Sequence, residues 1–269
     1  MKKIFLALSL LTILLYACQE KDVINPNDLE STQACQDHLI AENIFNDVGR
    51  IIEEGLQDNG QSKSCPNYLL MNVNTLDLDT LIIDFGNANC FHNEKLRRGK
   101  IMITYTGKYN DPYSVITSNF ENYYANDILI QGERIVTNQG TNADENMWFT
   151  IDINNASITT SNGTINWESN IVKEWISGEN TYLDITDDRY KITGTASGNG
   201  VNGNAFTMTI VDTLNIDLDC LPSCIIKSGS AKISPNGYSE RIINYGDSLC
   251  DCNVDVILNE TTYPIVISN

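Results

Sequence analysis

The 269-residue sequence has few histidines and few basic residues. It contains two histidines, His38 and His92, and 17 lysines and arginines against 35 aspartates and glutamates, which gives a net charge of −18. A surface of that sign repels phosphate backbones, so we expect no nucleic-acid partner. Neither histidine stands in a recognisable nucleophile signature, and the chain has no Gly-x-Ser-x-Gly elbow. These absences disfavour a Ser-His-Asp hydrolase, and we assign no catalytic residue.

Long apolar runs are also scarce. Residues 4–15 form a twelve-residue apolar run that is too short to cross a bilayer. Lys2 and Lys3 precede this run, which is the layout of a secretory signal. The next residues, Leu15-Tyr16-Ala17-Cys18, resemble the lipobox of bacterial lipoproteins. The resemblance implies that residues 1–17 are a signal peptide and that Cys18 becomes a lipidated N-terminus carrying acyl chains such as palmitate.

Cleavage after residue 17 would leave 252 residues with a net charge of −20, because the leader carries only two charges, both positive. An acidic chain is repelled by anionic head groups, so its membrane attachment would come from the lipid on Cys18. Residues 18–32 are polar and lack apolar periodicity, which predicts a flexible tether. The tether opens with Gln19-Glu20-Lys21-Asp22, similar to the acidic signal of surface lipoproteins of Bacteroidota. We therefore expect an outer-membrane lipoprotein of the cell envelope, displayed outward or facing the periplasm.

Eight cysteines in an exported chain indicate disulfides. If Cys18 carries lipid, an odd number remains, and Cys35 is far from the others in sequence. We expect Cys35 to be a free or intermolecular thiol.

An internal repeat suggests how the other cysteines pair. The segment IIDFGNANC at residues 82–90 matches IINYGDSLC at residues 242–250 in both isoleucines, the glycine and the cysteine. An earlier cysteine lies 25 residues before the end of the first copy and 26 before the end of the second. The predicted disulfides are Cys65–Cys90, Cys224–Cys250 and, nested outside the latter in antiparallel fashion, Cys220–Cys252.

Metal sites are the main alternative for these and other clusters. The thiols of residues 220, 224, 250 and 252 could hold zinc, but a single residue separates Cys250 from Cys252, fewer than structural zinc sites use. The pairs Asp77 with Asp79 and Asp217 with Asp219 each place two carboxylates on one strand face, without the further ligands of a calcium loop. We therefore predict disulfides and solvated strand faces, with no metal and no cofactor.

The secondary-structure pattern changes once along the chain. Residues 33–58 show apolar residues at helical spacing, which predicts an amphipathic helix. From residue 68 the pattern alternates with period two, and Gly, Asn and Asp interrupt it about every ten residues, which indicates hairpins. The expected strands span residues 80–85, 100–109, 114–120, 128–131, 134–138, 147–153, 164–176, 190–196, 205–219, 224–234, 239–245 and 254–267, the last broken at Asn259.

Consecutive hairpins with no intervening helix require an antiparallel sheet. The expected fold is mainly β: a long antiparallel curved meander or partly closed barrel with one N-terminal amphipathic helix over its apolar face. Residues 33–269 would form a single domain whose internal repeat covers residues 65–109 and 220–267. A family of Bacteroidota lipoproteins resembles most of residues 65–267, through the segments DFGNANC, RRGKIMITYTGKYNDPYSVITSNFENYY, ITGTASGNGVNG and INYGDSLCDC. That resemblance implies fold and location but no reaction.

Two further clusters could bind a partner. Trp148, Trp167 and Trp175 with Tyr123 and Tyr124 could form a platform for sugars, although aromatic residues in strands are more often core. The basic run at residues 97–100 is expected to enter a strand beside acidic neighbours. The sequence thus predicts a structural or interaction role with an unknown protein or glycan partner. The alternatives are a binder or carrier of an apolar or glycan ligand in the concave sheet and, last, an unidentified hydrolase.

Overall fold

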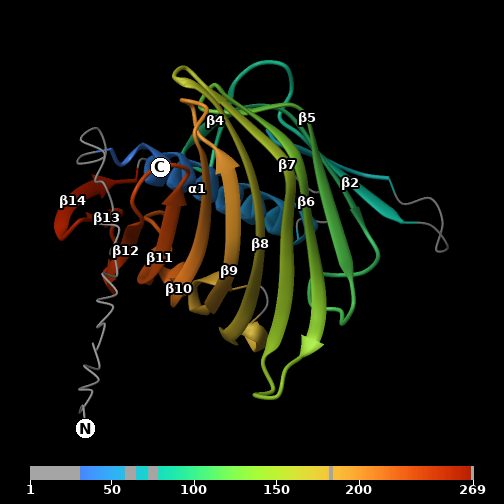
Figure 1. Cartoon of the computed structure of the whole chain (residues 1–269). Helices are drawn as coiled ribbons and strands as arrows, with labels where there is room; N and C mark the ends of the chain where they lie inside the picture. Colours follow the sequence, from blue (N-terminus) through green and yellow to red (C-terminus); the bar gives the residue numbers. More distant parts are fainter. Residues whose placement is uncertain (1–30, 58–64, 72–77, 182–183, 268–269) are drawn as a thin grey trace, which may run out of the picture.

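A computed structural model of the chain describes residues 31–57, 65–71, 78–181 and 184–267 (Figure 1). The expected signal peptide, Cys18, most of the tether and Asp77 lie outside these residues. The described part contains one α-helix, fourteen strands and three short 3₁₀ turns. They are α1 (Gln33–Gln57), β1 (Asn67–Leu70), β2 (Asp79–Asp84), β3 (Cys90–His92), β4 (Lys95–Tyr105), β5 (Val115–Ala125), β6 (Ile128–Thr141), β7 (Met147–Thr160), β8 (Gly163–Ser177), η1 (Glu179–Thr181), η2 (Ile185–Asp187), β9 (Arg189–Asn199), β10 (Ala205–Asp217), η3 (Leu218–Cys220), β11 (Ile226–Pro235), β12 (Arg241–Asp247), β13 (Asn253–Leu258) and β14 (Thr261–Val266).

The strands form one antiparallel sheet in which sequence neighbours are almost always spatial neighbours. Only β3 departs from the path: it pairs with the first residues of β4 (95–97), beside β2, which pairs with residues 100–105 of the same edge, while β5 occupies the other edge of β4. The sheet curls around the helix and stays open, with β1 and β14 at the two ends of the strand order (Figure 1). The expected fold class, an antiparallel meander with a single N-terminal helix, is confirmed, and the barrel does not close.

Strand β6 shows where the sequence pattern misled. Residues 128–131 and 134–138 were expected as two strands, but they belong to one strand that is bulged at Gly132. Gly132 has a φ of +121°, and a Cβ there would lie 2.7 Å from the Cα of Ala156, so only glycine allows this close backbone approach. A bulge inserts one residue and shifts the alternation, which reads in the sequence as a gap between two strands. Strands β1 and β3 were not expected.

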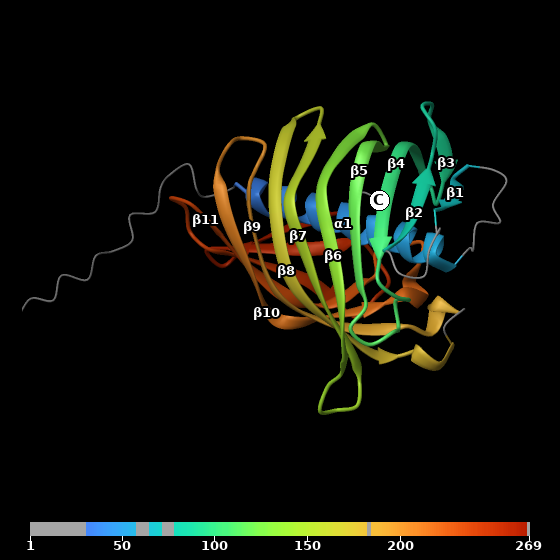
Figure 2. The same cartoon turned by 90° about the vertical axis from the view of Figure 1, so that its right-hand side faces the viewer.

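The helix lies in the concave side of the sheet and runs across the strands (Figure 2). Its apolar stripe, which includes Ile44, Val48, Ile51 and Ile52, is buried as the periodicity predicts. It contacts β2, β8 and β11. Because the sheet wraps around it, polar residues of the helix are buried as well, and these form the anchors described below.

The two copies of the repeat have the same local geometry at opposite ends of the sheet. In β2, Asp84 accepts a hydrogen bond from the amide of Gly86 (2.8 Å), and in β12, Asn244 accepts one from Gly246 (3.1 Å). In each copy the second isoleucine and the aromatic residue are buried, namely Ile83 with Phe85 and Ile243 with Tyr245. A Cβ on Gly55 would meet Ile83 at 2.7 Å, and Tyr245 donates to Glu42. The repeat therefore holds the helix from both sides.

Candidate functional site

A cavity of about 660 Å³ lies between α1 and the inner face of the sheet. Its lining combines residues of the second half of the helix, the turn between β3 and β4, the middle strands and the loop that follows β10. The lining residues are Asn43, Asn46, Asp47, Gly49, Arg50, Glu53, Glu54, Gln57, Asn93, Glu94, Lys95, Arg134, Ile151, Ile171, Lys173, Ile185, Tyr190, Ile192, Ile216, Leu218, Leu221, Pro222, Ser223, Cys224 and Ile225.

The lining has an apolar part and a polar part. Isoleucines of β7 to β10 and the residues at 218–225 supply the apolar part, while the helix and the β3–β4 turn supply most of the polar part. Glu94 and Pro222 are exposed, so the cavity reaches the surface near both. Such a space can accept a molecule with an apolar body and a polar end.

One wall is fixed by a buried ion pair between the helix and β4. Arg97 is fully buried and donates two hydrogen bonds to Asp47, at 2.7 and 2.9 Å. It also donates to the hydroxyl of Tyr123 (2.8 Å). Burial alone would raise the pKa of Asp47, but the hydrogen bonds and charge of Arg97, with the charge of Lys95, hold that pKa below its usual range. Asp47 is therefore a fixed anion.

This arrangement accounts for the basic run at residues 97–100. Arg97 pairs with the helix, Arg98 pairs with Asp127, and Lys100 lies 3.5 Å from Asp84. The run thus enters a strand beside acidic neighbours, as the sequence predicts.

The opposite wall is built around Lys173 of β8. Its ammonium lies 3.6 Å from Glu53, donates to the hydroxyl of Tyr109 (3.3 Å), and stands 3.8 Å over the ring of Tyr190. Burial lowers the pKa of Lys173, and the carboxylate of Glu53 opposes that shift. Asp188, behind Tyr190, accepts hydrogen bonds from Trp175 and Tyr190. Every polar atom named in this wall thus has a protein partner.

Arg134 of β6 lines the same cavity and differs from its neighbours. Only 5% of the residue is exposed, and its guanidinium lies close to the helix, where a Cβ on Gly49 would meet Nη2 at 2.9 Å. Burial lowers its pKa, and the charge of Glu53 acts in the opposite direction. Arginine nevertheless remains protonated in proteins. Within the part of the chain that the structure describes, the guanidinium of Arg134 makes no hydrogen bond and no ion pair.

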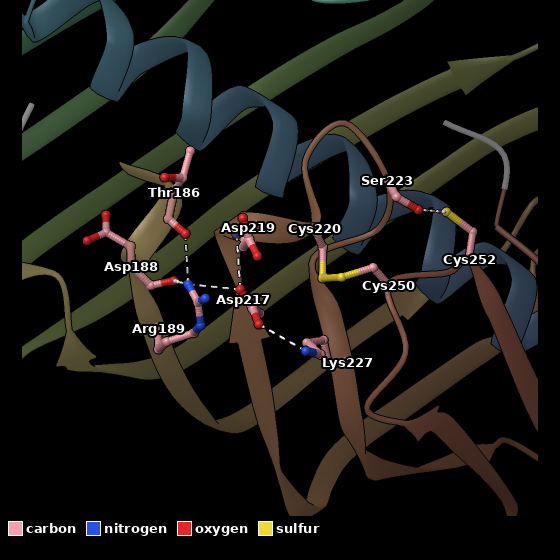
Figure 3. Close-up of a disulfide and its surroundings, with 10 residues drawn as sticks. All are labelled: Thr186, Asp188, Arg189, Asp217, Asp219, Cys220, Ser223, Lys227, Cys250 and Cys252. Atoms are coloured by element: carbon pink, nitrogen blue, oxygen red, sulfur yellow. Dashed lines mark hydrogen bonds and ion pairs between the residues drawn. A yellow bond between two sulfur atoms is a disulfide. The ribbon is translucent and has the colours of Figure 1, made fainter. Parts of the chain in front are cut away.

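Two disulfides brace the loop that closes the apolar part, as Figure 3 shows for Cys220–Cys250. Cys65 and Cys90 are joined as predicted. The nested pairing of the other four is wrong, because the structure joins Cys220 to Cys250 and Cys224 to Cys252. With these thiols in disulfides, the zinc alternative has no ligands left at this place.

The nested pairing assumed that β11 and β12 continue as an antiparallel ladder up to the cysteines. The ladder ends at the pair Ser228–Asp247, and the chain before β11 turns through η3 instead. The four cysteines therefore lie outside the ladder, where strand register does not decide which pair meets.

We expect non-reducing peptide mapping to give the fragments Cys220–Cys250 and Cys224–Cys252. Cleavage between Cys220 and Cys224 and between Cys250 and Cys252 is needed to separate these pairings from the nested ones. Mass spectrometry with electron-transfer dissociation identifies the two peptides joined by each disulfide. Recovery of Cys220 linked to Cys252 would contradict the structure.

Other residues singled out in the sequence lie away from the cavity or have structural partners. Cys35 is free and fully buried, and burial raises the pKa of its thiol to about 12, so the intermolecular bond considered above has no accessible sulfur. Asp217 pairs with Arg189 (2.9 Å) and Lys227 (3.0 Å) and accepts from the amide of Asp219 (Figure 3).

The aromatic platform, the less favoured of the two interpretations, does not form. Trp167, Trp175 and Tyr123 are buried, whereas Trp148 and Tyr124 are only partly buried. Trp175 and Tyr190 pack at 5.5 Å between ring centroids, as core residues do.

No protein-family model, curated protein or solved structure matches this chain. In the described residues, no helix is long and apolar enough to span a bilayer, and no three His, Cys, Asp or Glu side chains gather as a metal site would need. The cavity is therefore the feature from which function is argued.

Proposed function

We propose that this protein is an envelope lipoprotein that binds a small, largely apolar ligand in the cavity between α1 and the sheet. The observation that carries the proposal is the cavity itself. Its volume of about 660 Å³ falls inside the range of roughly 300–1,000 Å³ typical of small-molecule sites. Its lining is mostly apolar on the strand side and polar along the helix and the β3–β4 turn, so the cavity can hold a molecule that has an apolar body and a polar end.

The usual packing density of protein interiors favours a bound ligand in this cavity over an empty space in the core. Protein interiors pack at a density of about 0.75 and contain few voids larger than one water molecule. The inner face around the cavity obeys this rule, because Ile151 and Ile216 are almost fully buried. A purely structural lipoprotein, the first expectation from the sequence, has no need of an unfilled space of this size. Anchoring through Cys18 would place the site beside a source of apolar molecules, the membrane.

The test uses the full chain, purified in dodecyl maltoside, and a photoreactive probe. A diazirine-bearing hexadecanol is irradiated with the protein, and labelled peptides are mapped by mass spectrometry. We expect label on β8, β9 and the loop at residues 218–225. The Ile171→Trp variant, which fills the cavity with a larger side chain, is expected to lower that labelling about fivefold or more.

The matched control is Val172→Trp, because successive side chains of a strand point to opposite faces of the sheet. It adds the same indole one residue away on the outer face, and we expect wild-type labelling. Equal labelling of all three proteins, or label spread over the outer face, would refute ligand binding in the cavity.

A further inference from the structure

Arg134 is a buried cation to which the described residues offer no hydrogen bond and no ion pair, and the other buried arginines show how unusual this is. Arg97 has Asp47, Tyr123 and the carbonyl of His92 as acceptors. Arg241 donates to the carbonyls of Ser31 and Ser239. Arg134 is 5% exposed and, among the described residues, neither a hydrogen bond nor an ion pair reaches its guanidinium.

A buried charge with no partner is costly, so a folded protein is expected to supply a counter-charge. Among the described residues, no carboxylate forms an ion pair with Arg134: Glu53 acts on it through its charge alone, and this carboxylate lies 3.6 Å from Lys173. The position is fixed by the fold. Arg134 pairs across the sheet with Ser118 and Ile153, on the inner face, and lines the cavity together with Ile171.

The charges lining the cavity also differ from those of the whole chain. The chain carries −18, whereas the lining contains four acidic and four basic residues and is neutral. The acidic residues are Asp47, Glu53, Glu54 and Glu94, and the basic residues are Arg50, Lys95, Arg134 and Lys173. Arg97 pairs with Asp47 from behind the lining, so the site with this residue included has five basic and four acidic residues. One added anion, bound at Arg134, would make it neutral.

We propose that the ligand is an anionic amphiphile, a molecule with an apolar chain and a single carboxylate or phosphate head, and that Arg134 binds the head. The planar guanidinium can donate two parallel hydrogen bonds to either kind of head group. The apolar chain lies along the isoleucines of β8 to β10. This inference rests on the proposed function, because it names the ligand class of the same cavity.

The test compares three photoreactive probes of equal chain length on the full chain in dodecyl maltoside: the hexadecanol used above, the corresponding hexadecanoate, and the hexadecyl phosphate. The measured quantity is the probe concentration that gives half-maximal labelling of the cavity peptides at about pH 8. Charged hydrogen bonds contribute enough to predict that at least one anion half-saturates at a concentration about tenfold or more below that of the alcohol. Which anion is preferred separates a carboxylate from a phosphate head.

The decisive variant is Arg134→Met, which keeps the length of the side chain and removes its charge. We expect it to abolish the preference for anions and to leave labelling by the alcohol unchanged. The matched control is Lys191→Met, which removes an exposed cation of β9, and we expect it to keep the preference. Arg134→Lys should recover only part of the preference, because an ammonium cannot donate the two parallel bonds.

A thermal melt without probe distinguishes this role from a structural one. A cation that waits for a ligand contributes nothing to the empty protein, so the melting temperature of Arg134→Met should equal or exceed that of the wild type. Wild-type protein labelled equally by alcohol and anions, or an Arg134→Met variant that retains the preference, would overturn the inference and leave ligand binding intact. If no probe labels the cavity, the proposed function itself fails.

Discussion

Replacing Asp47 by alanine is expected to lower the free energy of unfolding by about 3–5 kcal/mol, because it leaves Arg97 as an unpaired buried charge. The two hydrogen bonds from Arg97 to Asp47 are 2.7 and 2.9 Å long, and Arg97 is fully buried. Lys95 also lies 3.6 Å from Asp47 and would lose this partner. Urea denaturation, followed by tryptophan fluorescence, measures the change.

Two further variants show whether the loss of stability comes from an unpaired buried charge. Asp47→Ala combined with Arg97→Met removes both charges, and we expect it to recover most of the lost stability, because replacing a buried ion pair by apolar residues is often nearly neutral. Asp127→Ala breaks the pair with Arg98 on the surface, where 68% of the Asp127 side chain is exposed, and should leave the midpoint unchanged. An Asp47→Ala protein as stable as the Asp127→Ala protein would contradict the structure.

The same pair explains why the cavity has a defined shape. Asp47 belongs to the helix, and Arg97 to β4 near one end of the sheet. Near the other end, Asp37 accepts a hydrogen bond from the amide of Val201 (3.1 Å), and Glu42 accepts one from Tyr245 (2.8 Å). These polar contacts fix the helix from its first turn to just past its middle, and the helix lines the cavity from Asn43 to its last residue. Hydrophobic packing is non-directional and could not fix the helix at that distance from the strands.

The helix and the strands could be predicted from the sequence because each depends on local periodicity. The stripe through Ile44, Val48 and Ile51 predicts the buried face directly. The partner of Asp47 could not be predicted, because Arg97 is 50 residues away and a charge carries no information about its distant neighbour. The cavity was equally hidden, since it results from the curl of the sheet and the path of the helix.

The sequence nevertheless contains a pattern that could have indicated Arg134 and Lys173 as cavity residues. Each lies on the apolar face of its strand. Arg134 is two residues before Val136, and Lys173 is two residues from both Ile171 and Trp175. A cation at an inward position requires either a partner or a ligand. The error in the disulfide pairing has a different cause. The nested pairing applied antiparallel strand register to cysteines that lie beyond the ends of the strands.

Raising the pH from about 5 to about 8 is expected to stabilise a Glu42→Gln variant relative to the wild type by about 3 kcal/mol. Burial raises the pKa of Glu42 from 4.5 to about 7, partly opposed by the hydrogen bond from Tyr245. As the pH rises above 4.5, the unfolded chain releases this proton while the folded protein retains it up to a pH of about 7. The unfolded state then binds fewer protons, so wild-type stability falls across that window. Glutamine does not titrate and still accepts the hydrogen bond.

His38, one turn before Glu42, produces the opposite slope. Its Nδ1 accepts a hydrogen bond from Trp167 (3.3 Å), and its Nε2 lies 3.8 Å from Glu42. Burial lowers the pKa of His38 from 6.5 to about 3, so the unfolded chain takes up a proton first as the pH falls, and stability is lost between these values. The two slopes overlap between pH 4.5 and 6.5, where wild-type stability should be nearly constant.

Removing the Glu42 carboxyl should reveal the histidine slope alone, with Glu42→Gln gaining stability steadily as the pH rises from about 4.5 to 6.5. Urea midpoints measured at half-unit intervals of pH resolve the two curves. Parallel curves for the two proteins would mean that Glu42 titrates as an ordinary surface carboxylate, and that this section of the helix is not enclosed by the sheet.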